Sequence, residues 1–210
     1  MPLIIGGGSE IDDLTIDGVS LDSLVVDGTE VWRKMEAGDQ LSDGSYVLGV
    51  FNGYWLIVAP NDETEPAYGG VYDYPLYTGS TVDGVSNTVS MVNKVNAGLG
   101  TYNPDDGKTP NAAILCDDKT TGGHTDWYLP AIDELYFLWS QRNVLTGGLS
   151  GIGIITSTSV YPDPYYYLSS SVQQDRREGS NKLMKFDDGN PGYGSRRFQY
   201  NVRAFRRIPA

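Results

Sequence analysis

Two apolar runs in the first third of the chain predict a β-hairpin. Residues 46–51 and 54–59 are rich in Val, Leu, Ile and aromatic side chains, and Asn52-Gly53 joins them. Asn-Gly between apolar runs is the strongest short hairpin signal, because both residues tolerate positive φ. We therefore expect two antiparallel strands over residues 46–59.

A helical period follows Pro130. The apolar residues at positions i, i+3, i+6 and i+7 are Ile132, Leu135, Leu138 and Trp139. This spacing gives a helix one apolar face. Pro130 suits the first helical position, and Asp133 and Glu134 place negative charge at the positive end of the helix dipole. We expect this helix to pack on a sheet, with Trp127 as a buried anchor just before it.

The remaining pattern predicts two more helices and several strands. One helix is expected to begin at Ser86 or Asn87, either of which can cap it, and to run to about residue 95. Its inward side chains are expected to be Val89, Met91, Val92 and Val95. A short helix at 110–118 is expected to bury Ala112, Ala113, Leu115 and Cys116. Strands are expected at 152–155, 165–168, 183–186 and 200–208, with loops between them.

The first 34 residues contain an internal repeat. Residues 11–20 and 21–30 each hold a short apolar strand followed by Asp-Gly, a turn signal. Such short units cannot bury a core alone. They are either a plain hairpin that caps the main domain or a module for oligomerisation or attachment, and we favour the module. The predicted organisation is a β-repeat arm at 1–34, a linker at 35–44 and one domain at 45–210.

Composition narrows the class of protein. The 210 residues include 26 Gly and 15 Tyr, with 20% charged residues and a formal net charge of −12. This balance favours a β-rich, loop-rich surface protein. It argues against nucleic-acid binding, which needs clustered Lys and Arg. No run approaches the ~20 apolar residues of a membrane helix, and the short apolar run at residues 3–5 does not predict a signal peptide.

Several segments resemble one family. The stretch Asp126-Trp127-Tyr128-Leu129-Pro130-Ala131-Ile132-Asp133-Glu134-Leu135 resembles the DW-x-LPS-x-x-EL core of the DUF1566 family, the C-terminal domain of the Legionella collagen-like adhesin. Four further segments are similar to the family in order: 86–88 to its helix start, 112–117 to its AA-x-x-C-D segment, 156–159 to its W-[ST]-S-[ST]-E strand and 202–206 to its closing VR-x-VR. Ile155 and Ser159 depart from the Trp and the acid of that strand, and residues 169–171 are an alternative alignment for it.

The resemblance implies an α+β, C-type-lectin-like fold with two helices and twisted antiparallel sheets. Its structural motif here would be Asp126, Trp127, Leu129, Pro130, Glu134, Leu135 and Arg203. The arm is similar to the short repeated strands at the start of bacteriophage tail and head-fibre proteins, including the closing Val31-Trp32. Together the likenesses imply a virion fibre or decoration protein. It would form a homotrimer and contact other virion proteins through residues 1–34.

No catalytic residues are expected. His124, the single histidine, is interpreted as a turn residue, Cys116 as a packed thiol, and no G-x-S-x-G pattern occurs. Residues 103–107 offer oxygen ligands without the D-x-D-x-D-G frame of a calcium loop. Glu65-Pro66-Ala67 breaks the Glu-Pro-Asn pattern of sugar-binding C-type lectins. We expect no cofactor and no metal, with calcium as the alternative.

Tyrosine-rich loops are the best binding candidates, because tyrosine gives contact area at low entropic cost. The candidates are Tyr161, Asp163, Tyr165, Tyr166, Asn190, Tyr193 and Arg196. The alternative is that half of the tyrosines belong to the core or to a subunit interface. We expect a receptor-binding protein of the virion surface, directed at a host glycan or protein. The alternatives are a structural cement protein and an enzyme acting on surface polysaccharide. Receptor binding predicts exposed aromatics far from the arm, and cement predicts those aromatics buried against another chain.

Overall fold

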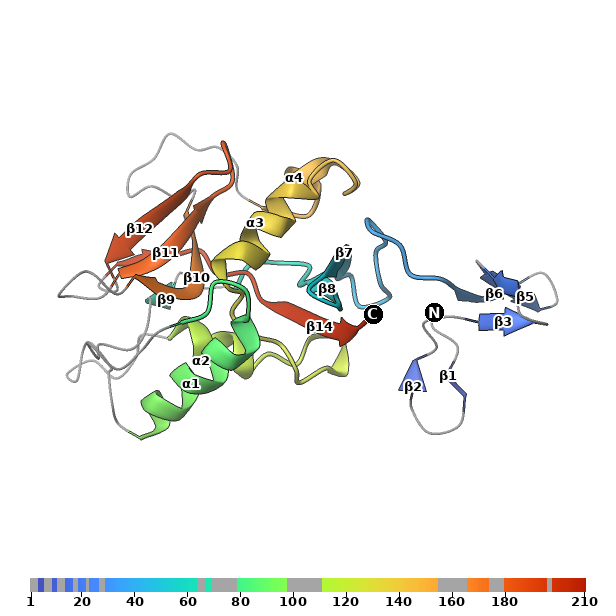
Figure 1. Ribbon diagram of the computed structural model, residues 1–210, viewed down its shortest axis with the longest axis horizontal. Coiled ribbons are helices and arrows are strands. Elements are labelled where there is room, and N and C mark those ends of the chain that lie inside the picture. Colours follow the sequence, from blue (N-terminus) through green and yellow to red (C-terminus); the bar gives the residue numbers. More distant parts are fainter. Residues whose placement is uncertain are drawn as a thin grey trace.

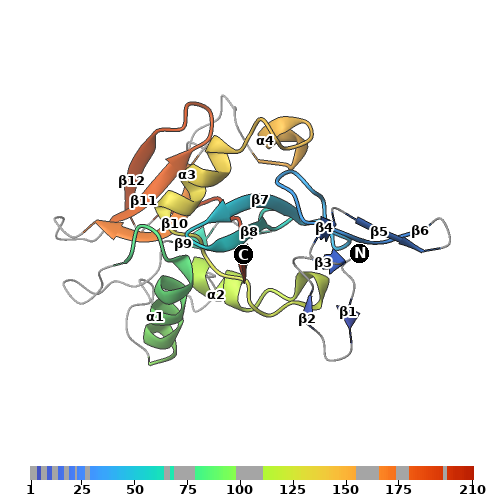
Figure 2. The ribbon, with the colours of Figure 1, turned by 45° about the vertical axis from the view of Figure 1, so that its right-hand side comes forward.

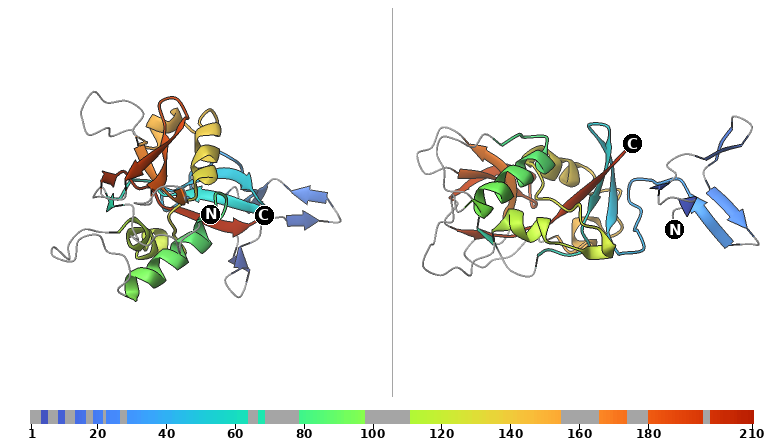
Figure 3. Two further views of the ribbon diagram at one scale, coloured as in Figure 1. Left: turned by 60° about the vertical axis from the view of Figure 1, so that its left-hand side comes forward. Right: turned by 90° about the horizontal axis from the view of Figure 1, so that it is seen from below.

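The structure is a computed structural model. It describes the side chains of residues 34–63, 67, 79–97, 111–154, 166–172, 180–195 and 198–210, and the backbone alone at residues 68 and 173 and in the strands before residue 34. In the arm, the strands pair antiparallel as β1 (Ile4–Ile5) with β2 (Ser9–Glu10), β3 (Leu14–Ile16) with β4 (Val19–Leu21), and β5 (Ser23–Val26) with β6 (Thr29–Arg33). Each unit of the repeat is thus a hairpin rather than a single strand. The hairpins lie at one end of the molecule, outside the other sheets (Figures 1 and 3).

The first sheet of the main domain joins its two ends. It consists of β7 (Tyr46–Phe51), β8 (Tyr54–Val58) and β14 (Phe205–Pro209), in the order β14-β8-β7, with both pairs antiparallel. Asn52 and Gly53 have φ of 51° and 81°, as a type I′ turn requires. The hairpin predicted at 46–59 is therefore confirmed.

The segment expected as a linker lies along β7. The Gly38 N–H donates to Val47 O at 2.8 Å, and the Val47 N–H donates to Asp39 O at 2.9 Å. Leu41 packs against the core. Gly38 has a φ of +97°, and a β-carbon there would lie 2.4 Å from Val144 O. Part of residues 35–44 therefore belongs to the packed structure of the domain.

The second sheet contains a strand that the sequence pattern does not predict. It has the order β10 (Tyr166–Gln173), β11 (Ser180–Lys185), β12 (Pro191–Ser195), and a small pair is formed by β9 (Ala67–Tyr68) and β13 (Gln199–Tyr200). The sequence pattern predicts a loop at β12, which contains Gly192 and Gly194. Those glycines allow close packing of two rings: a β-carbon would lie 2.8 Å from the Tyr166 ring at Gly192 and 2.2 Å from the Tyr200 hydroxyl at Gly194.

Two of the predicted strands are corrected, while those at 165–168 and 183–186 fall largely on β10 and β11. At 152–154 the chain leaves α4 (Gly148–Gly151), and Ile152 and Ile154 are buried where the helix ends, while Ile155 lies outside the described residues. A short apolar run does not distinguish a strand from another buried segment. The strand predicted at 200–208 is interrupted between β13 and β14, where Arg203 is buried.

Helix α1 (Gly84–Asn96) begins earlier than expected. Asp83, not Ser86 or Asn87, is its N-cap, and its carboxylate accepts the Ser86 N–H at 3.1 Å. This start turns Asn87, Thr88 and Met91 inward and leaves Val89 51% exposed, so the predicted inward position of Val89 is wrong. Met91 is fully buried in the core, and Val92 and Val95 are partly buried against it.

The other helices follow the predictions closely. Helix α2 (Ala112–Asp117) buries Ala112, Ala113 and Cys116. Helix α3 (Ile132–Ser140) follows a short 3-10 turn, η1 (Thr121–Gly123), and starts with Ala131 as N-cap. Pro130 therefore precedes the helix rather than occupying its first position. Ile132, Leu135 and Leu138 are buried, and α3 packs on β10 and β11 (Figure 2).

The core consists of two apolar clusters. One gathers α1, α2, Trp127 and β11, and the other gathers α3, β7, β8 and the end of α4. Helices thus cover parts of two small antiparallel sheets that come from separate stretches of the chain. This arrangement is of the α+β class.

Candidate functional site

Trp127 and its neighbours hold the fold together. Trp127 is 2% exposed, and its indole N–H donates to Thr121 O at 3.2 Å. Tyr128 exchanges backbone hydrogen bonds with Phe205, at 2.8 and 2.9 Å, which attaches this segment to β14. Asp126 forms an ion pair with Arg206 at 2.9 Å. Trp127 is therefore the buried anchor that the sequence predicts, and Leu129 beside it is fully buried.

Glu134 joins the starts of two helices. Its carboxylate is buried and accepts hydrogen bonds from the Tyr128 hydroxyl at 2.9 Å and from the Ala131 N–H at 2.7 Å. Ala131 has no side-chain oxygen, so only this half of a capping box is present. Gly84, at the start of α1, lies so close that a β-carbon there would be 2.5 Å from Glu134 Oε2. Burial raises the pKa of Glu134 to about 7.

Two of three consecutive buried serines on β10 link the strand to these helices. Ser171 Oγ accepts the Ile132 N–H at 3.0 Å and donates to Ser80 O at 2.7 Å. Ser170 Oγ accepts from the Asn87 amide at 3.0 Å. Ser169–Ser171 lie within β10, whereas the rival segment 156–159 lies outside the described residues. Buried hydroxyls satisfied in this way stabilise one arrangement of helix and sheet.

Arg203 is the centre of a buried ion pair. It is 1% exposed, and its Nε donates to Asp62 Oδ1 at 2.6 Å. Its Nη1 donates to Ala59 O at 2.8 Å and to Ile152 O at 2.9 Å. Tyr167 donates to the second oxygen of Asp62 at 2.6 Å. Arg203 therefore connects three segments inside the domain, as a residue of the structural motif would.

Cys116 and His124 are the two residues that nucleophilic catalysis would use. Cys116 is fully buried, and burial raises the pKa of its thiol well above the usual range. This confirms the packed thiol. His124 lies at the end of η1, and no group of three or more His, Cys, Asp or Glu that could hold a metal occurs among the described residues. Residues 65 and 66 of the Glu-Pro-Ala segment and residues 103–107 lie outside the described part of the chain.

The seven predicted ligand residues fall into two groups. Tyr161, Asp163, Tyr165 and Arg196 lie outside the described residues. Of the others, Tyr166 is half-buried with its ring against Gly192. Asn190 is exposed in the turn between β11 and β12, and Tyr193 on β12 is 54% exposed.

Tyr193 shares its end of the domain with Phe198, which the sequence reasoning missed. Phe198 is 65% exposed and directly precedes β13. Tyr193 is directed outward because Gly192 and Gly194, on either side of it, meet the Tyr166 and Tyr200 rings. β12 and β9, the strand that pairs with β13, lie at the end of the domain opposite the arm (Figure 1). We call Tyr193 and Phe198 the aromatic face. The alternation of Gly and Tyr at residues 192–194 is the one sequence signal that predicts an outward-facing side chain at Tyr193.

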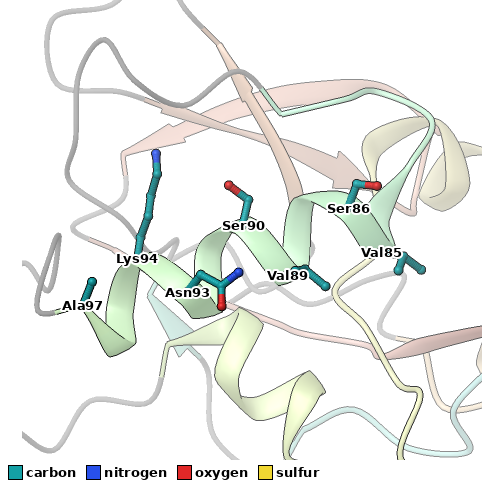
Figure 4. A pocket seen from close by; sticks show the side chains of 7 residues that line it. All are labelled: Val85, Ser86, Val89, Ser90, Asn93, Lys94 and Ala97. Atoms are coloured by element: carbon teal, nitrogen blue, oxygen red, sulfur yellow. The ribbon is translucent and has the colours of Figure 1, made fainter.

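A shallow groove of about 580 Å³ runs along the outer side of α1. Figure 4 shows its lining side chains projecting from the helix, with Val85 and Val89 nearer the start and Lys94 nearer the end. Val82, just before α1, is 41% exposed. The groove is thus an apolar strip with a polar border.

No protein-family model matches this sequence, and no curated protein matches it. The likeness to the DUF1566 family therefore rests on the motif residues alone. Among the described residues, none of the helices is long and apolar enough to cross a membrane.

Proposed function

We propose that the chain is a bacteriophage fibre or tail protein that binds a receptor on the host surface without catalysing a reaction. In this proposal residues 1–34 attach the chain to other virion proteins and assemble it as a homotrimer. The domain at 45–210 is C-type-lectin-like and binds a surface glycan or protein. The single observation that carries the proposal is the position of the aromatic face.

The aromatic face has the properties of a binding surface. Phe198 and Tyr193 are 65% and 54% exposed, so both rings offer a large surface that a partner can cover. Tyrosine and phenylalanine are also rigid, so little side-chain entropy is lost on binding. The face lies opposite the arm (Figure 1). A chain attached through its arm would present that end outward.

The arrangement of strands supports the lectin-like class. The last strand, β14, pairs with β8, so the beginning and the end of the domain meet in one sheet. A second antiparallel sheet and two main helices, α1 and α3, complete the domain. The buried positions of Trp127 and Glu134 support the view that the shared motif is structural. Binding would then depend on the displayed loops and strands.

The second candidate is a cement or decoration protein, and the apolar strip on α1 favours it. Val89 and Val82 are 51% and 41% exposed. Side chains of this kind commonly pack against another chain in an assembly. In the assembled particle, receptor binding predicts an aromatic face exposed to solvent, and a cement function predicts one covered by another chain.

The test is binding of the fluorescently labelled full chain to a panel of bacterial cells and surface glycans, with and without EDTA. We expect saturable binding that EDTA does not change. The double variant Tyr193→Ala plus Phe198→Ala should weaken it about tenfold or more, as loss of central aromatic contacts does. Tyr136→Ala is the matched control, because Tyr136 is 51% exposed on α3. No saturable binding by the folded chain, or equal loss in the control, would overturn receptor binding through this face.

A further inference from the structure

A second concave surface uses different residues. A cleft of about 500 Å³ lies between the end of α3, the start of α4 and the turn that joins β11 to β12. The cleft is nearly as open to solvent as the groove on α1, so a ligand bound there would stay partly in contact with water. Leu149 and Phe186 form a buried apolar floor. None of the residues of the aromatic face lines it.

Trp139 fixes one wall of the cleft. The Arg142 guanidinium lies 3.9 Å from the centre of the indole ring, and its Nη1 donates to Trp139 O at 3.0 Å. Gly189 lies against the same indole, since a β-carbon there would be 2.4 Å from Cε2. The indole therefore holds Arg142 in place, which orders a donor before any ligand arrives.

Two carboxylates also line the cleft. Asp187 pairs with Lys185 at 2.8 Å. Asp188 accepts the Asn190 N–H at 3.0 Å and lies 3.5 Å from Lys185. Their side chains stay 33% and 44% exposed, so each keeps acceptor positions open to a ligand.

Asn143 is a further polar residue that lines the cleft, and its amide can both donate and accept hydrogen bonds. It is exposed at the rim, and its amide has no hydrogen-bond partner among the residues that the structure describes. The charges balance, with Arg142 and Lys185 against Asp187 and Asp188. An anionic ligand would meet the two carboxylates, and a cation would compete with Lys185. A neutral ligand with several adjacent hydroxyls matches donors and acceptors without introducing charge.

We propose that this cleft binds one neutral monosaccharide unit, a hexose or an N-acetylhexosamine. Asp187 and Asp188 accept hydrogen bonds from its hydroxyls, Arg142 donates to its oxygens, and Asn143 does either. The binding is independent of the aromatic face and requires no metal.

The test is a titration of the full chain with free sugars in the presence of EDTA. Binding is monitored through the NMR signal of the Trp139 indole N–H. The probes are methyl glycosides of neutral hexoses, N-acetylglucosamine and, as the charged comparison, glucuronate. We expect saturable binding of a neutral sugar with a Kd of about 1–10 mM, usual for a single small polar ligand, and weaker binding of glucuronate.

Two variants and a matched control decide the location. Asn143→Ala and Asp187→Asn should each weaken binding about tenfold, since each removes or weakens a hydrogen bond to the ligand. Asn93→Ala, the same change at an exposed site on α1, should leave the Kd unchanged. Asn143 and Asn93 are both exposed, so these variants should fold. No saturable binding of any neutral sugar, tighter binding of glucuronate, or an unchanged Kd in Asn143→Ala would overturn the proposal. Because Asn143 and Asp187 line the cleft and Tyr193 and Phe198 do not, the variants distinguish failure of this proposal from failure of receptor binding through the aromatic face.

Discussion

Glu134 should make the stability of the domain fall as pH rises. The perturbation that isolates this effect is Glu134→Gln, which keeps the shape of the side chain and removes its titration. The glutamine oxygen can still accept the Ala131 N–H, and its amide can donate to the Tyr128 hydroxyl. Every other titrating group is the same in both proteins. The difference between their free energies of unfolding therefore reports Glu134.

The magnitude follows from the pKa. Burial raises the pKa of Glu134 from the ordinary 4.5 to about 7 in the folded protein. A raised pKa means that the fold favours the protonated acid, so this group's stabilisation is complete below about pH 4.5 and is lost as pH rises through 7. At about 1.4 kcal/mol per pKa unit, the full effect is about 3 kcal/mol. About 2.5 kcal/mol of it falls between pH 5 and pH 8.

The assay is urea unfolding of both proteins, followed by tryptophan fluorescence at several pH values from 5 to 8. We expect the wild type to lose about 2.5 kcal/mol relative to Glu134→Gln over this range. A difference that stays constant, or that moves in favour of the wild type as pH rises, would refute the reasoning. It would mean that the N–H groups at the two helix starts and the Tyr128 hydroxyl stabilise the carboxylate at least as much as burial destabilises it.

Two further predictions concern the core. Arg203→Met should lower the free energy of unfolding by about 2–4 kcal/mol in urea melts, because it leaves two buried backbone carbonyls without a donor and the partly exposed Asp62 carboxylate without its charged partner; a loss under about 1 kcal/mol would contradict the structural role of the pair. Cys116 should not react with a thiol reagent in the native protein and should react fully in urea, because its side chain is fully buried; fast labelling of the native chain would show that the thiol is accessible.

Local signals predicted the elements that depend on neighbouring residues. Asn52-Gly53 is sufficient for the hairpin because both residues adopt the positive φ that the turn requires. The apolar spacing in α3 predicts its buried face because a regular helix fixes which side chains share a side. These features depend little on distant parts of the chain.

Features that depend on distant partners could not be predicted. Asn87 and Thr88 are polar, yet they are buried because Ser170 and the Leu129 backbone supply hydrogen bonds. Strand β12 is hidden by its glycines, whose advantage is visible only when the Tyr166 and Tyr200 rings lie against them. The cleft at α4 combines residues more than 35 positions apart in the sequence, Asn143 and Asp187 among them, so no local motif marks it.

The most direct test of receptor binding is hydroxyl-radical footprinting of the chain in assembled particles and in the free state. Tyr193 and Phe198 are the reporters, exposed Tyr136 is the reference, and buried Trp127 is the internal control that should not react in either state. If the aromatic face is displayed to the host, Tyr193 and Phe198 will be oxidised in the particle at the same rate as in the free chain. If both are protected in the particle while Tyr136 still reacts, the face is covered by another virion protein, and the chain is a structural component rather than a receptor-binding one.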